Sequence, residues 1–134
     1  MGLPRIAGEF GVYADPEIRF SQKGLAVATV KCVSKKRVRD ANGTWTDGDP
    51  LFIDITVFGT LAENVVETVT KGATVIVDGT LEQQHWEDKE SGEKRSKFVI
   101  IADSIGVSTR WSAWERKDTE VKAAAAPQEE TPPF

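Results

Sequence analysis

The sequence contains few of the residues that disulfides, metal centres and catalytic dyads require. It has one cysteine, Cys32, and one histidine, His85, among 134 residues. A single cysteine excludes an internal disulfide and a multi-cysteine zinc site. We therefore expect Cys32 to be a buried or strand-lining thiol, not half of a catalytic pair with His85. We expect no metal and no other cofactor.

Long apolar runs are also absent. No stretch approaches the roughly 18 apolar residues that would cross a bilayer, and residues 1–5 lack the basic and apolar pattern of a signal peptide. We expect a cytoplasmic protein with no membrane partner. With 40% hydrophobic residues, the length suits one modest domain at 1–110 and a flexible tail at 111–134.

Charge is unevenly distributed along the chain. Lysine and arginine number 17 against 21 acidic residues, for a net charge of −4. Between residues 31 and 39 there is no acid, and the basic residues are Lys31, Lys35, Lys36, Arg37 and Arg39. Such a run can neutralise the phosphates of a nucleic acid, or it can be an ordinary solvated surface.

Residues 51–58 alternate between two different faces. Side chains in a strand point alternately to opposite sides, so Ile53, Ile55 and Val57 form an aliphatic face that predicts a core. The other face carries Phe52 and Phe58 at its ends, roughly 20 Å apart at the usual rise per residue. These rings either pack under a loop or a subunit, or they bind a flat, extended ligand.

The remaining pattern predicts a small barrel. Strands are expected at 5–12, 25–33, 73–85 and 97–107, and a hairpin turns at residues 40–43, where Asn42-Gly43 is a turn signal. Thr60 and Glu63 have the spacing of a capping box, which predicts a helix of about ten residues that ends near residue 71. An all-β chain of five strands with one short helix between the third and fourth is typical of an OB-fold barrel.

Five short motifs resemble bacterial single-stranded DNA-binding protein. They are DPEIRF at 15–20, FGTLAE at 58–63, KG at 71–72, VDGTL at 77–81 and WED at 86–88. The similarity extends from about residue 8 to residue 107. It implies sequence-independent binding of single-stranded DNA, assembly as a homotetramer, and a bacterial or phage-encoded protein acting in the bacterial cytoplasm, the nucleoid or an infected cell.

The resemblance also assigns residues. The side chains that stack on bases in the family correspond to Phe52, Phe58 and Trp86. Many members carry a further stacking tryptophan near position 38, and Trp45 is a candidate to replace it. The basic residues from Lys31 to Arg39 would contact phosphates. The C-terminal tip resembles the family's acidic tail that recruits replication and repair proteins, or it only solubilises the chain. Its residues are Glu129, Glu130, Pro132, Pro133 and Phe134.

Two alternatives compete with this interpretation. Asp54 and Asp78 on neighbouring strands could hold Mg²⁺ in a nuclease, but no third ligand or general base is spaced to help, so we predict no enzyme. A related barrel could instead bind RNA or act as a replisome adaptor. Trp111 and Trp114, after the barrel, would dock on it or form an adhesive segment.

Overall fold

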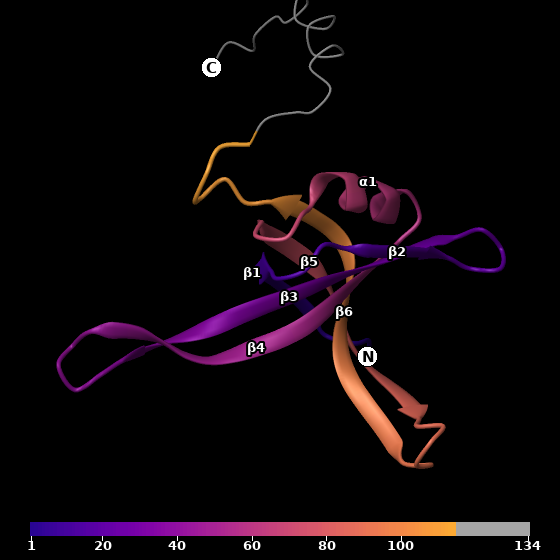
Figure 1. Cartoon of the computed structure of the whole chain (residues 1–134), viewed down its shortest axis with the longest axis horizontal. Coiled ribbons are helices and arrows are strands. Elements are labelled where there is room, and N and C mark those ends of the chain that lie inside the picture. Colours follow the sequence, from indigo (N-terminus) through magenta and orange to yellow (C-terminus); the bar gives the residue numbers. More distant parts are fainter. Residues whose placement is uncertain (115–134) are drawn as a thin grey trace, which may run out of the picture.

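The computed structural model describes residues 1–114 as six strands and one helix (Figure 1). In chain order these are β1 (Arg5–Val12), β2 (Glu17–Phe20), β3 (Ala26–Arg39), β4 (Trp45–Phe58), α1 (Thr60–Thr68), β5 (Thr74–Glu87) and β6 (Lys94–Val107). In this part of the chain, α1 is neither long nor apolar enough to cross a membrane.

Five of these strands close into a barrel. β1 pairs antiparallel with β5 on one side and with β3 on the other, β3 pairs with β4, and β5 with β6. A short parallel pairing of β4 with β6 completes the ring. The predicted five-stranded OB-fold barrel, with its helix between the third and fourth barrel strands, is therefore confirmed.

The barrel interior is filled by the alternating residues that the sequence pattern predicts. Val30 and Cys32 of β3 and Ile55 and Val57 of β4 are fully buried. Because the barrel is narrow, β-branched side chains from facing strands fill most of it, and Phe10 is the one large ring in the buried core of the described residues. Burial raises the pKa of the Cys32 thiol to about 12, so this thiol stays protonated and serves as a small apolar group.

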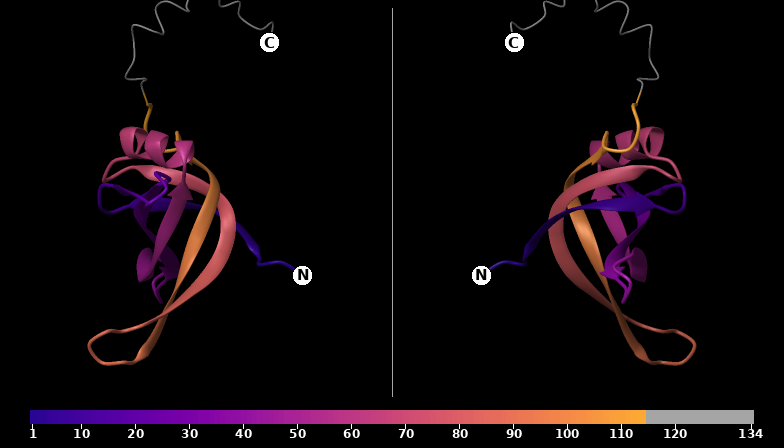
Figure 2. Two further views of the ribbon diagram at one scale, coloured as in Figure 1. Left: turned by 90° about the vertical axis from the view of Figure 1, so that its right-hand side faces the viewer. Right: turned by 90° about the vertical axis from the view of Figure 1, so that its left-hand side faces the viewer.

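The helix lies across one end of the barrel (Figure 2) and buries Ala62 and Val65; Val69, directly after it, is also buried. The predicted capping box is wrong, because no side chain caps the first turn. Gly59 is the N-cap residue instead, with a φ of 69° that favours glycine. The helix ends at Thr68, short of the expected position.

One of the six strands, β2, was not predicted from the sequence. All four residues of β2 are exposed, so β2 buries nothing and leaves no periodicity in the sequence. Pairing with the start of β3 holds it in place, with Glu17 opposite Thr29 and Arg19 opposite Val27. β2 therefore widens the sheet beside β3 and does not contribute to the core.

Two long hairpins project from the barrel in different directions (Figure 1). The β3–β4 hairpin turns at the predicted Asn42-Gly43, where Gly43 has a φ of 80°. The Asp40 carboxylate stabilises the turn by accepting the backbone N–H groups of Asn42 and Thr44, each at 2.9 Å. The β5–β6 hairpin turns at Gly92, whose φ of 73° is also positive.

Candidate nucleic-acid interface

Outward-pointing side chains of β3 and β4 form one continuous surface, which we call the outer face. Residues directly opposite each other on paired strands point to the same side. The register therefore defines four cross-strand pairs on this face: Val27 with Phe58, Thr29 with Thr56, Lys31 with Asp54, and Val33 with Phe52. β2 extends the face at one edge, where Arg19 lies opposite Val27.

Both β4 rings are exposed on the outer face. Phe52 is 61% exposed and Phe58 is 43% exposed. The expectation that neither ring belongs to the core is confirmed. Tyr13, directly after β1, meets the ring of Phe52 edge-on, with centroids 5.5 Å apart and an interplanar angle of 84°. This contact restricts how the Phe52 ring can turn.

Trp86 joins the same face from the neighbouring hairpin. In β5, Glu82 lies opposite Val99 of β6, which in turn lies opposite Asp54 of β4. Glu82 therefore points outward with Asp54, and by alternation so do Gln84 and Trp86. Trp86 is 45% exposed. The three rings expected to meet bases therefore share one side of the sheet.

A bulge determines where Trp45 points. Lys35 pairs with Pro50 but Arg37 pairs with Asp47, so β4 has one extra residue in this interval. That residue reverses the alternation of β4 and returns Trp45, opposite Arg39, to the side of Phe52. The Arg39 guanidinium lies over the indole, 5.9 Å from its centroid.

The side chains of the predicted basic run do not all lie on one side of the hairpin. Lys31, Lys35, Arg37 and Arg39 alternate onto the outer face, whereas Lys36 points to the other side of the hairpin. The return strand also carries acids, and Asp47 forms an ion pair with Lys35 at 3.9 Å. Four cations therefore lie on the ring-bearing side, and one of them is partly neutralised.

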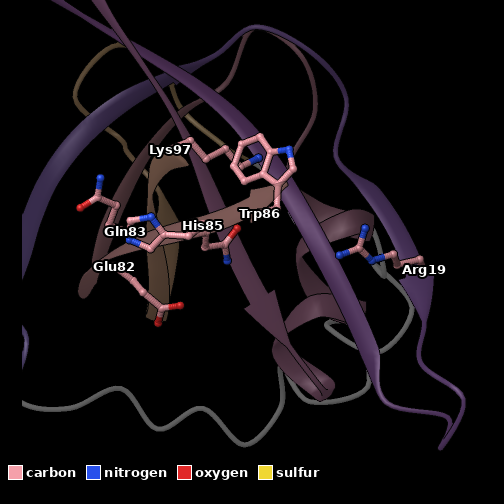
Figure 3. A pocket seen from close by; sticks show the side chains of 7 residues that line it. Arg19, Glu82, Gln83, His85, Trp86 and Lys97 are labelled. Atoms are coloured by element: carbon pink, nitrogen blue, oxygen red, sulfur yellow. The ribbon is translucent and has the colours of Figure 1, made fainter. Parts of the chain in front are cut away.

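An open groove of about 840 Å³ lies beside Trp86 (Figure 3). Its lining residues come from β2, β5 and β6: Arg19, Glu82, Gln83, Gln84, His85, Trp86 and Lys97. Lys97 is held by Asp54, with 3.1 Å between Nζ and Oδ2. Within residues 1–114, the side chains of Arg19, Glu82 and Gln84 make no hydrogen bond or ion pair. These three groups therefore face solvent with their polar atoms free.

The tip of the β5–β6 hairpin is organised around Asp88. The backbone N–H of Glu90 and then the Arg95 guanidinium donate to its carboxylate, at 2.9 and 3.0 Å, and both lower the pKa of Asp88. Arg95 is the cross-strand neighbour of Trp86. Its guanidinium is therefore engaged at the tip and is not free for a phosphate beside that ring.

Sequence reasoning missed three contributors to this surface. Arg19 belongs to the strand that was not predicted, and Lys97 reaches Asp54 through a parallel pairing that no local pattern indicates. Tyr13 contacts Phe52 across 39 positions of sequence. The one available signal was that DPEIRF, a motif quoted for the resemblance, contains Arg19.

The two carboxylates considered for a metal site are engaged separately. Asp54 pairs with Lys97, and Asp78 pairs with Arg5 at 3.2 Å. Across residues 1–114, no group of three or more His, Cys, Asp or Glu side chains is arranged to hold a metal ion. The arrangement gives no support to the nuclease alternative.

After the barrel, the Trp114 indole N–H donates to the carbonyl of Ser108, directly after β6, at 2.8 Å. Trp111 does not dock. It is 67% exposed, and the Arg110 guanidinium lies 4.8 Å from its ring centroid. The predicted partner-binding residues of the tail, 129–134, lie outside the described residues.

A small closed barrel with exposed rings and cations on one face belongs to the class of oligonucleotide-binding barrels. Residues 10–108 match the model of the Single-strand binding protein family. The chain is a member of that family.

Its relatives are consistent with this assignment. The chain is 44% identical over 100 residues to a single-stranded DNA-binding protein of Mycobacterium tuberculosis, covering 74% of this chain and 60% of the relative. It is 46% identical over 99 residues to one of Corynebacterium glutamicum, covering 72% and 43%. The chain thus spans about half of each relative's length. The crystal structure of a small single-stranded DNA-binding protein from Streptomyces coelicolor superposes with a TM-score of 0.68 at 25% identity, covering 81% of this chain and 97% of that one.

Proposed function

We propose that this chain binds single-stranded DNA largely without regard to base sequence, and so protects exposed strands during replication, recombination and repair. The observation that carries the proposal is the placement of Phe52, Phe58 and Trp86. All three rings are exposed and lie on one side of the sheet. Large rings exposed on a common face suit a partner that supplies many flat, apolar surfaces in a row.

Stacking on aromatic rings gives a binding free energy that depends little on which base is bound. Each base stacked on an aromatic ring contributes about 1–3 kcal/mol, because every base has a π-face. Trp45 can provide a fourth ring beside the β3–β4 cations. Lys31, Lys35, Arg37 and Arg39 neutralise phosphates, a contribution that weakens as salt rises. Lys36 is left out of this set, because it points away.

Assembly and recruitment complete the proposal. We infer a homo-oligomer, expected to be a tetramer, since several protomers sharing one strand raise the overall affinity without new contacts. Domain 1–110 binds DNA, and the tail from residue 111 recruits replication and repair proteins through its acidic tip. We place the protein in the bacterial cytoplasm or nucleoid, or in an infected cell if a phage encodes it. We infer a binding protein and not an enzyme.

Titration with oligo(dT) tests the central claim. Stacking on Trp86 should quench the intrinsic tryptophan fluorescence, and Phe52→Ala should weaken binding about 10-fold. Phe98→Ala is the matched control. Phe98 is 56% exposed, close to Phe52, but it alternates with Ile100 on the inward side of β6. Equal losses for the two variants, or no binding of oligo(dT), would refute the proposed face.

Competition between DNA and RNA oligomers of the same length and sequence distinguishes the proposed function from the RNA-binding alternative. Stacking and phosphate contacts are available to both polymers, but only RNA has a 2′-hydroxyl to be read. We expect DNA to compete at least as well as RNA. A clear preference for RNA would favour the alternative.

A further inference from the structure

The groove beside Trp86 has a composition that phosphate binding does not explain. Glu82 and Gln84 alternate with Trp86 on the outward side of β5, and all three line the groove. Glu82 and Trp86 are labelled in Figure 3. A carboxylate repels a phosphate backbone. Asp54, on the same face, is neutralised by Lys97, whereas Glu82, the one acid among the residues that line the groove, has no partner in the described part of the chain.

The spacing along β5 suits successive nucleotides. Alternate outward residues of a strand are about 6.6 Å apart, so a DNA strand that leaves the ring of Trp86 along β5 passes Gln84 and then Glu82. Arg19 lines the same groove from β2 with its guanidinium unpaired. It offers a charge to the backbone, while the two β5 side chains face the bases.

The chemistry of a carboxylate determines which bases it can accept. A carboxylate is an acceptor without a proton to give. Cytosine presents the N4 amino group as a donor, whereas the corresponding position of thymine is the O4 carbonyl. Glu82 therefore gains a hydrogen bond from cytosine and meets repulsion from thymine. Gln84 can both accept and donate, so it tolerates either base.

We propose that Glu82 gives this groove a preference for bases with an exocyclic amino group, so that cytosine is bound better than thymine at one subsite of an otherwise unselective interface. The proposal rests on the proposed function, since it needs a DNA strand on the outer face. The negative charge of Glu82 weakens the attraction of the groove for the phosphate backbone, but its carboxylate lets the groove discriminate between bases.

The test compares oligo(dC) with oligo(dT) of equal length at neutral pH, using the full chain. Glu82→Ala removes the acceptor and should lower the ratio of dC to dT affinity about 5-fold. Glu90→Ala is the matched control. It removes the same charge from the same hairpin, outside the groove. It should raise both affinities by equal factors and leave the ratio unchanged.

A second measurement removes the donor from the DNA and leaves the protein intact. Oligomers of N4,N4-dimethylcytosine keep the ring but lose both N–H groups, so wild-type protein should bind them less tightly than oligo(dC), and Glu82→Ala should bind the two alike. If Glu82→Ala keeps the wild-type dC to dT ratio, or methylation has no effect, the preference is refuted while oligo(dT) binding stands. If neither oligomer binds, the proposed function fails as well.

Discussion

The two sides of β4 belong to one strand but are shaped by different requirements. Ile55 and Val57 are fully buried and face the barrel, whereas Phe52 and Phe58 on the other side are exposed. Packing explains the first pair, since the interior must be filled at high density. Folding does not explain the second pair, because a smaller polar residue would suit a solvated face as well. The proposed function accounts for them as rings that stack on the bases of a bound strand.

The outer face is itself uneven. The β3–β4 hairpin carries most of the cations, with Arg39 against Trp45. The β5–β6 hairpin has Trp86 beside an unpaired acid, and its Lys97 and Arg95 are held by Asp54 and Asp88. In the binding mode proposed above, the first hairpin contacts mainly phosphates and the second mainly bases. The contrast between inner and outer sides, and then between the two hairpins, can be tested with single substitutions.

The largest effect is expected at the inner side. Ile55→Ala should lower the free energy of unfolding by about 2–5 kcal/mol, because the removed atoms leave a cavity among residues that cannot collapse around it. Ile55 lies between Val30 and Ile100 in the register, and all three are fully buried. Urea unfolding followed by circular dichroism measures the change, at one protein concentration because the proposed assembly would contribute to stability.

Thr56→Ala is the neighbouring control for this substitution. Thr56 is half-buried and points to the outer face, so its truncation should change stability by only about 0.5 kcal/mol. The distinction between the two sides of β4 would fail if both variants unfolded at the same urea concentration.

Alternation made the inner side predictable, because burial leaves a period of two in the sequence. The same rule put Phe52 and Phe58 on the side of β4 away from the core. It failed for β2, which buries nothing, and it could not place Trp45, because one extra residue in β4 reverses the alternation. A bulge can be recognised in a sequence only when the partner strand and the pairing register are already known. The contact of Tyr13 with Phe52 depends on the pairing of β1 with β3, which is set by barrel closure.

An intermediate effect is expected within the basic run. Arg37→Gln should reduce the slope of the logarithm of affinity against the logarithm of salt concentration by roughly 0.7, the value for one phosphate contact on a single strand. Lys36→Gln removes the same charge from the adjacent residue on the other side of the hairpin. It should leave the slope unchanged. Fluorescence titrations over a range of salt concentrations give both slopes, and equal slopes for the two variants would show that the run acts as a diffuse charge.

The smallest effect is expected where β1 supports the outer face. Tyr13→Leu removes the ring that meets Phe52 edge-on, a contact of about 0.5–1.5 kcal/mol, so it should weaken oligo(dT) binding about 3-fold by freeing the Phe52 ring. Tyr13→Phe keeps the ring and should bind as wild type does. In the background of Phe52→Ala, Tyr13→Leu should have no further effect, because the ring it orients is gone. A loss that persists in that background would mean that Tyr13 contacts the DNA itself.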